Sequence, residues 1–216
     1  MRQVQAMALV PFLIGISVIA GSRQNAEAPK DLDARVTAFL QQHRNDWHDL
    51  NVPEADGQQL YDLVVKNGYK RALEIGTSTG RSGTYIAWAL AKNGGKLITI
   101  DIDEGRHRQA VQNFKDAGVG AFVDARLGDA HDIVPKLDGP FDFVFSDADK
   151  DWYINYANAV LPKLRVGGCF ATHNVSGGRG RRGSNGDYYA FMTALPYLEN
   201  SLTPGGLLIS YKRREQ

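Results

Sequence analysis

From residue 71 onward, short apolar runs alternate with longer amphipathic segments, and this alternation restricts the chain to a small set of folds. The runs are five or six residues long, as in buried strands, and the segments between them carry apolar residues at helical spacing. The predicted strands are residues 71–75, 96–100, 121–126, 141–145 and 169–173. The predicted helices are residues 31–50, 57–66, 82–92, 104–117, 130–137 and 151–164. Strands that alternate with helices predict βαβ units, and right-handed crossovers then place helices on both faces of a parallel sheet.

The C-terminal part of the chain departs from this alternation. After a helix predicted at residues 188–195, two apolar runs at 198–202 and 207–212 are separated by Thr203-Pro-Gly-Gly206. A Pro-Gly-Gly turn between apolar runs is typical of a β-hairpin. The sequence therefore predicts an α/β fold with a Rossmann-like sheet, mostly parallel and finished by an antiparallel C-terminal hairpin. A dinucleotide-binding sheet is wholly parallel, so the hairpin indicates a different member of this fold class.

The first 28 residues differ from the rest of the chain. Arg2 precedes an apolar run at 6–20, and Ala26-Glu27-Ala28 has the A-x-A pattern of a cleavage site. This order is typical of a secretory signal peptide, although a retained membrane anchor needs only about 17 apolar residues. We expect residues 1–28 to be a signal peptide or membrane anchor of an exported, periplasmic or membrane-anchored protein, and residues 29–216 to form one domain. The alternative is a cytoplasmic protein with a misassigned start codon.

Charge and cysteine content exclude several classes of protein. The net charge is only +1, so the chain lacks the basic footprint that a nucleic-acid partner requires. Cys169 is the single cysteine, which excludes an internal disulfide and a zinc site built from several thiolates. We therefore expect no nucleic-acid partner, and contact with a membrane only through the N-terminal segment.

A glycine-containing loop at residues 73–82 follows a predicted strand and opens a predicted helix. Gly76 and Gly80 allow the backbone to turn sharply and to approach a ligand, and the N–H groups at a helix start favour a negative charge. In a methyl donor that charge is the methionine carboxylate, to which Ser82 is placed to add its hydroxyl. Glu74 is placed to anchor either the loop or the donor's ammonium group. The candidate cofactor-binding residues of this loop are Glu74, Gly76, Thr77, Gly80 and Ser82.

Two more elements follow the next two strands. Asp101 closes the second strand, about 20 residues after the loop, where an acidic side chain accepts hydrogen bonds from ribose hydroxyls. Asp129 follows the third strand and is placed to bind an adenine amino group, while Gly128 lets the ring lie close. Each element alone is also compatible with a capped turn. Three of them in order predict a nucleoside site, and the G-x-x-x-G spacing differs from the G-x-G-x-x-G of nicotinamide cofactors.

With these motifs the chain resembles the class I S-adenosylmethionine-dependent methyltransferases, and within them the catechol and caffeoyl-CoA O-methyltransferases. The resemblance covers about residues 53–213 and rests on residues 73–80, 98–101, 141–150, Tyr153 and 204–210. It implies a seven-stranded sheet with an antiparallel final strand, and S-adenosylmethionine as the cofactor. It also implies a divalent metal cation, a small-molecule acceptor with a hydroxyl group, and a homodimer.

The same resemblance suggests metal ligands near the ends of the fourth and fifth strands. Asp147 matches the first metal carboxylate and Asn174 the metal-binding asparagine. His173 stands where the family has an aspartate, which removes one negative charge and replaces a hard oxygen ligand by imidazole. Three alternatives follow: a different metal, a lower affinity, or no metal at all.

Methyl transfer from a sulfonium is an in-line displacement, for which a protein mainly supplies alignment and exclusion of water. The acceptor must also lose a proton. Lys150 matches the general base of the catechol-type enzymes, and His173 is the alternative base if no metal binds. The candidate catalytic residues are Lys150, Asp147 and His173, and Asp147 also belongs to the candidate cofactor site. A solvated lysine and a histidine hydrogen-bonded to a carbonyl are the structural alternatives.

Two other functions compete with methyl transfer. One is a non-catalytic nucleoside-binding protein on a methyltransferase scaffold, because the methyl donor is made in the cytoplasm and the N-terminus suggests export. The other is a nicotinamide-dependent oxidoreductase. The glycine spacing of residues 76–80 and the hairpin around Pro204 argue against it.

Overall fold

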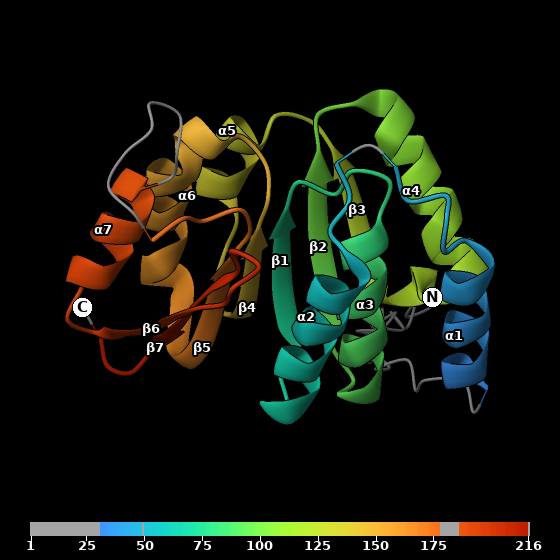
Figure 1. Cartoon of the computed structure of the whole chain (residues 1–216), viewed down its shortest axis with the longest axis horizontal. Coiled ribbons are helices and arrows are strands. Elements are labelled where there is room, and N and C mark those ends of the chain that lie inside the picture. Colours follow the sequence, from blue (N-terminus) through green and yellow to red (C-terminus); the bar gives the residue numbers. More distant parts are fainter. Residues whose placement is uncertain (1–30, 49, 178–185, 216) are drawn as a thin grey trace, which may run out of the picture.

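A computed structural model describes residues 31–48, 50–177 and 186–215. These residues form one seven-stranded sheet with helices on both faces (Figure 1). The strands are β1 (Arg71–Ile75), β2 (Lys96–Asp101), β3 (Val123–Leu127), β4 (Phe141–Ser146), β5 (Leu164–Thr172), β6 (Leu198–Leu202) and β7 (Leu208–Lys212). The α-helices are α1 (Leu32–Gln42), α2 (Glu54–Lys66), α3 (Arg81–Lys92), α4 (Glu104–Ala117), α5 (Ala130–Ile133), α6 (Tyr153–Val160) and α7 (Gly186–Ala194). Short 3-10 turns lie at Gly120–Phe122, Val134–Lys136, Lys150–Trp152 and Leu161–Lys163.

The strand order is β3-β2-β1-β4-β5-β7-β6. The strands β1 to β5 pair in parallel, whereas β7 is antiparallel to both of its neighbours, β5 and β6. This confirms a mostly parallel sheet with an antiparallel final strand. The position of β7 refines the prediction, since β7 inserts inside the sheet and leaves β6 at its edge. The strand order reverses between β1 and β4, where ligands bind at the carboxyl ends of parallel strands.

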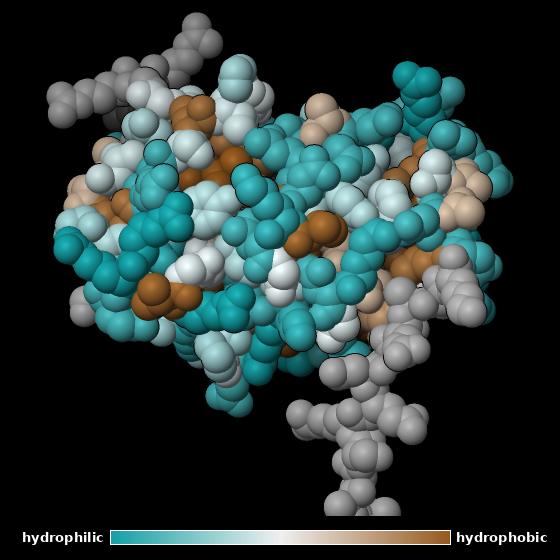
Figure 2. Space-filling view, turned by 90° about the horizontal axis from the view of Figure 1, so that it is seen from below, coloured by the Kyte–Doolittle hydropathy of each residue, from teal (hydrophilic) through white to brown (hydrophobic). Residues whose placement is uncertain are grey.

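Two apolar clusters hold the helices to the sheet. One packs α1, α2, α3 and α4 against one face, and the other packs α5, α6 and α7 against the opposite face. Successive residues of β1 divide between them: Ala72 belongs to the first cluster and Leu73 to the second, and both are fully buried. The inner strand β1 is therefore apolar on both sides, as expected for a parallel sheet covered by helices. Figure 2, which looks from below Figure 1, shows hydrophobic residues only in small separate patches among hydrophilic ones.

Several predicted boundaries differ from the observed ones. The helix predicted at residues 31–50 ends at Gln42, and the chain then turns so that Trp47 packs edge-on against Phe39. The helices predicted at residues 130–137 and 151–164 both finish as 3-10 turns, at Pro135 and Pro162. Proline lacks the N–H that an α-helix interior needs, which explains the change of helix type.

The remaining shifts lengthen or shorten an element by a few residues. The strand predicted at 169–173 begins at Leu164, and the one predicted at 121–126 begins at Val123 after a 3-10 turn. The helix predicted at 57–66 begins at Glu54, directly after Pro53. In the part of the chain that the structure describes, no helix is both long and apolar enough to cross a membrane. The signal peptide or anchor predicted at residues 1–28 lies outside those residues.

Candidate active site

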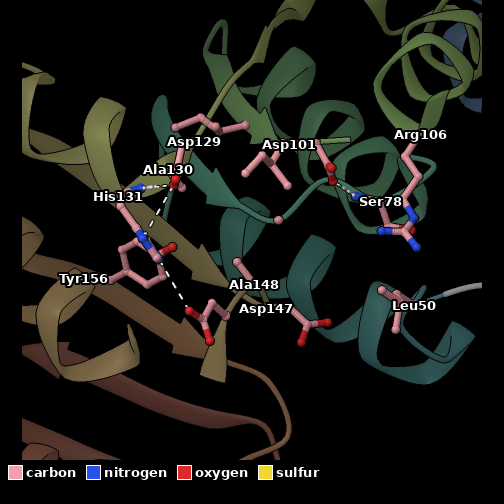
Figure 3. A pocket seen from close by; sticks show the side chains of 14 residues that line it. Leu50, Ser78, Asp101, Arg106, Asp129, Ala130, His131, Asp147, Ala148 and Tyr156 are labelled. Atoms are coloured by element: carbon pink, nitrogen blue, oxygen red, sulfur yellow. Dashed lines mark hydrogen bonds and ion pairs between the residues drawn. The ribbon is translucent and has the colours of Figure 1, made fainter. Parts of the chain in front are cut away.

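A cavity of about 310 Å³ opens at the carboxyl ends of β1, β2, β3 and β4. Its walls combine small, acidic and aromatic side chains. They come from Leu50, Gly76, Ser78, Ile100, Asp101, Ile102, Arg106, Asp129, Ala130, His131, Asp147, Ala148, Asp149 and Tyr156. In Figure 3, Ser78, Asp101 and Arg106 lie on one side of the cavity and His131 and Tyr156 on the other.

The loop after β1 reaches the cavity because Gly76 has no side chain. Its φ is +95°, and a Cβ atom there would lie 2.9 Å from the backbone carbonyl of Asp147. The loop therefore runs directly against the segment that follows β4. Two residues farther on, the Ser78 N–H donates to the Asp101 carboxylate over 2.7 Å, and the Asp103 N–H donates to its other oxygen over 2.9 Å. Each carboxylate oxygen keeps a second lone pair, so Asp101 still has acceptor capacity at the cavity wall.

A buried polar network supports this loop from below. Glu74 is fully buried and accepts a hydrogen bond from the Thr99 hydroxyl, with the Ser82 hydroxyl close by, and the Thr77 hydroxyl hydrogen-bonds to that of Thr99. Burial raises the pKa of Glu74 to about 8, against the opposing effect of the two hydroxyls. Glu74, Thr77 and Ser82 do not line the cavity. Of the two roles weighed for Glu74, its geometry matches the anchoring of the loop.

Two more glycines shape the walls without lining the cavity. Gly80 begins α3 with a φ of +94°, and a Cβ atom there would lie 2.9 Å from the Phe114 ring. Gly128 has a φ of +153°, and its Cβ atom would lie 2.9 Å from the Ile133 side chain. Both positions therefore need glycine for close packing of helices against the loops.

The opposite wall contains Asp129, which the sequence predicted, and His131 and Tyr156, which it did not. Asp129 caps α5 by accepting from the His131 N–H over 2.8 Å. The His131 ring stacks on Trp152 with centroids 4.1 Å apart, and its Nε2 lies 3.4 Å from an Asp149 carboxylate oxygen. Tyr156 of α6 lies beside this pair, 5.8 Å from the His131 centroid. His131 could have been found from the sequence, because it lies only two residues after the predicted site residue Asp129.

Next to this cavity, His173 lies between two carboxylates. Its Nδ1 lies 3.0 Å from Asp147 Oδ2, and its Nε2 lies 3.0 Å from Asp56 Oδ2. The side chains of His173, Asp147 and Asp56 are only 8%, 11% and 13% exposed. Burial alone would lower the pKa of His173, but hydrogen bonds and charges from Asp147 and then Asp56 outweigh it, so the pKa is raised. Asp56, in the first turn of α2, was not anticipated from the sequence.

Lys150 and Asn174 form a second pair at the same place. Lys150 Nζ donates to Asn174 Oδ1 over 2.7 Å and lies 3.5 Å from Asp147 Oδ1. Asn174 follows β5 with a φ of +55°, a left-handed conformation that asparagine tolerates better than most residues. The structure thus brings together all four residues predicted at this end of the sheet: Asp147, Lys150, His173 and Asn174.

These residues do not fit a divalent cation as they are arranged. A histidine ligand must offer a lone pair, whereas each nitrogen of His173 faces a carboxylate oxygen, which only accepts hydrogen bonds when ionised. The Asn174 oxygen is likewise hydrogen-bonded to an ammonium group. Among the described residues, no group of three or more His, Cys, Asp or Glu side chains is arranged to hold a metal ion.

Comparison of the sequence with known proteins gives a consistent family. The sequence profile of the O-methyltransferase family matches residues 25–179. A caffeoyl-CoA O-methyltransferase from Petroselinum crispum is 33% identical over 177 residues, which cover 79% of this chain and 69% of that protein. A catechol O-methyltransferase from Niastella koreensis is 41% identical over 130 residues, which cover 58% of each protein.

Solved structures agree with the sequence comparison. An O-methyltransferase from Bacillus cereus, in complex with SAH, superposes with a TM-score of 0.69 at 25% identity and covers 86% of this chain and 92% of that one. An O-methyltransferase from Streptomyces achromogenes involved in tomaymycin synthesis, in complex with SAM, has a TM-score of 0.69 at 26% identity and covers 83% and 90%. With a profile match over more than half of its length and this sheet topology, the chain belongs to the O-methyltransferase family.

Proposed function

We propose that this protein transfers a methyl group from S-adenosylmethionine to a hydroxyl group of a small-molecule acceptor. The observation that carries the proposal is the cavity at the reversal of strand order. There the Gly76 loop and Asp101 form one wall, and Asp129 and Tyr156 form the other. A nucleoside donor needs an acceptor group for its ribose and a flat surface for its base, and these walls supply both.

The charge of the cavity suits a cationic donor. Four carboxylates line it, those of Asp101, Asp129, Asp147 and Asp149, against the single guanidinium of Arg106 and the imidazole of His131. S-adenosylmethionine carries a positive sulfonium and a positive ammonium group. A cavity with acidic walls favours such a ligand over a neutral one of the same size.

The chemistry requires alignment and one proton transfer. As the acceptor oxygen forms its bond to the methyl carbon, the bond between that carbon and sulfur breaks, and the hydroxyl proton must leave. Asp147 lines the cavity while also lying 3.5 Å from Lys150 Nζ, so it connects the donor site to the candidate base. Lys150 is our candidate for the proton acceptor, which requires its ammonium group first to release a proton to solvent, because only the neutral amine has a lone pair. The main contribution of the site is to hold donor and acceptor in line.

The acceptor that we propose is a phenolic hydroxyl. This rests on the relatives, which are named for caffeoyl-CoA and for catechol. Both contain an aromatic ring with adjacent hydroxyl groups.

The test combines binding with turnover. Calorimetry should detect S-adenosylhomocysteine binding and no comparable heat with NAD. Mass spectrometry should detect a product 14 mass units heavier when S-adenosylmethionine is mixed with catechol or caffeoyl-CoA, as one CH₂ unit is gained (about 14 Da). Asp101→Asn should weaken binding, whereas Asp62→Asn, in an exposed hydrogen bond on α2, should not. Binding without any methylated product across a panel of phenols would instead support a non-catalytic nucleoside-binding protein.

We also propose that residues 1–28 act as a signal peptide or membrane anchor, which Arg2, the apolar run and the A-x-A pattern support. N-terminal sequencing of the protein from exported, membrane and soluble fractions tests this. A mature N-terminus near Pro29 would support cleavage. An uncleaved chain in the soluble fraction would argue for the cytoplasmic alternative.

A further inference from the structure

We propose that methyl transfer by this protein is independent of a divalent metal, because contacts made by Asp56, His173 and Lys150 already occupy the groups that would otherwise bind the cation. The inference rests on the proposed function, since it concerns the site beside Asp147 where the acceptor would bind. The family resemblance implies a metal held by Asp147, by Asn174 and by the position of His173. Each of these three positions is engaged in a contact that competes with a metal.

The imidazole of His173 is engaged at both of its nitrogens. Its two nitrogens lie at 3.0 Å from oxygens of different carboxylates, those of Asp147 and Asp56. Both ring nitrogens are therefore engaged by carboxylate oxygens in this arrangement. A metal bound to either nitrogen would have to break one of these two buried hydrogen bonds.

The candidate oxygen ligands, those of Asn174 and Asp147, lie next to Lys150. Asn174 Oδ1 accepts from Lys150 Nζ over 2.7 Å, and Asp147 Oδ1 lies 3.5 Å from the same nitrogen. A divalent cation coordinates such oxygens at about 2.0 to 2.6 Å. It would therefore have to displace the Lys150 ammonium group from Asn174, and because the Lys150 side chain is 43% exposed, water weakens the repulsion between the two cations.

Asp56 completes the arrangement from a different part of the fold. It lies in the first turn of α2, and α2 approaches α3 closely because Gly57 has no side chain: a Cβ atom there would lie 2.5 Å from the Tyr85 ring. The backbone of His173 is fixed as well. Its main-chain N–H donates to the Ser146 carbonyl, and its main-chain carbonyl accepts from the Tyr153 hydroxyl over 3.1 Å. Asp56 and His173 are thus both placed by well-packed elements, which indicates a built contact rather than a chance meeting of two surface side chains.

Asp147 and Asp56 bring two negative charges into a site that is almost closed to water. Such charges need nearby donors, and His173 and Lys150 provide them with hydrogen atoms directed at the same carboxylate and amide oxygens. The positive side of this site is therefore built from side chains, where the family pattern has a cation.

The decisive experiment is a metal titration of the wild-type protein. After dialysis against EDTA, calorimetry with MgCl₂, MnCl₂ and ZnCl₂, in the presence of S-adenosylhomocysteine, should show no binding heat, and elemental analysis of the purified protein should show no stoichiometric metal. Methylation in EDTA should stay within about two-fold of its rate with added Mg²⁺, whereas a metal that acts as Lewis acid would make EDTA lower it by about a hundred-fold. Stoichiometric metal with saturable heat would overturn the inference.

A substitution tests the residue that carries the argument. His173→Asp restores the carboxylate of the family pattern and should gain saturable Mg²⁺ or Mn²⁺ binding with a Kd below about 1 mM. His173→Asn, which places a side chain of the same size as aspartate but without its charge, should gain no metal binding. Thermal unfolding establishes whether both variants are folded, and the wild-type titration decides if either is not. An EDTA-resistant wild type whose His173→Asp variant binds no metal would show that His173 is not what excludes the cation.

The inference and the proposed function fail separately. Absence of S-adenosylhomocysteine binding and of methylated product would refute the proposed function, while the metal titration would still report on the site. Methylated product that forms only with added metal would refute metal independence and leave the proposed function intact.

Discussion

Gly76 is the residue at which the cofactor loop depends most directly on the absence of a side chain. Gly76→Ala would force a non-glycine residue to a φ of +95° and push its Cβ to 2.9 Å from the Asp147 backbone. We expect it to lower the free energy of unfolding by about 2 to 3 kcal/mol and to weaken S-adenosylhomocysteine binding. Urea denaturation and calorimetry measure the two effects.

The matched control is Gly68→Ala. Gly68 also has a positive φ, +64°, but no atom lies within 4 Å of the position of its Cβ. Only the backbone penalty applies there, about 1 kcal/mol, with no change in ligand affinity. Equal effects of the two substitutions would contradict the role assigned to the contact between Gly76 and Asp147.

Glu74 predicts a pH dependence of stability. Burial raises its pKa from an ordinary value of 4.5 to about 8 in the folded protein. Between these two values the folded state holds a proton that the unfolded state has released, so the contribution of Glu74 to the free energy of unfolding falls as pH rises. Glu74→Gln keeps the shape of the protonated form and cannot ionise. Its stability relative to wild type should therefore increase steadily from pH 5 to pH 8, as measured by urea denaturation. A difference that stays constant over this range would show that Glu74 is not protonated in the folded state.

The sequence predicted most of the residues at the site but not all their partners. Asp147, Lys150, His173 and Asn174 follow two neighbouring parallel strands, so topology alone brings them to one edge of the sheet. Asp56 lies 117 positions from His173 in the chain, and its helix was predicted to begin only at Gly57. No local pattern relates two such residues, and only the packing of α2 on α3 places the carboxylate against the imidazole.

At the scale of the elements, helix ends were predicted well where capping residues mark them. The helix at residues 104–117 is observed at the same bounds. Asp103 caps its start by accepting from the Arg106 N–H, and Gly118 ends it with a φ of +84°. The helix predicted at residues 31–50 has no such signal after Gln42, so the prediction extended it eight residues too far, to residue 50. A capping residue lies next to the helix end in the sequence and predicts it, whereas the packing that ends α1 at Gln42 involves no such local pattern.

Lys212 of β7 joins the final strand to the 3-10 turn that follows α6 and to the first residue of β5. Its ammonium group is buried, with the side chain 1% exposed, and donates to the carbonyls of Leu161 and Leu164 at 3.3 and 2.9 Å. Lys212→Met keeps the apolar stem but leaves both carbonyls without this donor. We expect a loss of about 2 to 3 kcal/mol in the free energy of unfolding.

The control for this prediction is Lys163→Met. Lys163 Nζ also donates to two carbonyls, but its shorter contact, to Pro135 over 2.8 Å, is exposed and water replaces it readily, and its half-buried contact, to Val134, is long at 3.4 Å. A loss below about 1 kcal/mol is expected. Chemical denaturation of both variants measures the contrast, and similar losses would mean that burial is not what makes Lys212 important.

For the whole molecule, the alternation of runs and the C-terminal hairpin were enough to predict the fold class, and the sheet confirms it. They did not predict that β7 inserts between β5 and β6. A hairpin fixes only that β6 and β7 are antiparallel neighbours, and either of them satisfies that condition as the partner of β5. The choice falls to β7, whose residues 208–210 and 212 are buried, whereas the pattern of β6 alternates between half-buried and exposed. The strand with more apolar surface to cover takes the interior position.

Because the cavity draws its walls from the ends of four strands and from helices on both faces, ligand binding should stabilise the whole domain rather than one loop. A ligand that binds only the folded state at 100 times its Kd adds about 2.7 kcal/mol. For a domain of this size that corresponds to a rise in Tm of about 5 to 10 °C. S-adenosylhomocysteine should therefore raise Tm by this amount in a single cooperative transition, followed by calorimetry over a range of ligand concentrations.

In Asp101→Asn the Tm without ligand also falls, because the Asn side chain has one acceptor oxygen, whereas the two N–H groups now donate to two carboxylate oxygens. The informative quantity is thus the ligand-induced shift, which should shrink in this variant and remain unchanged in Asp62→Asn. A shift confined to one of two separate transitions would mean that the cavity belongs to a part of the fold that unfolds on its own.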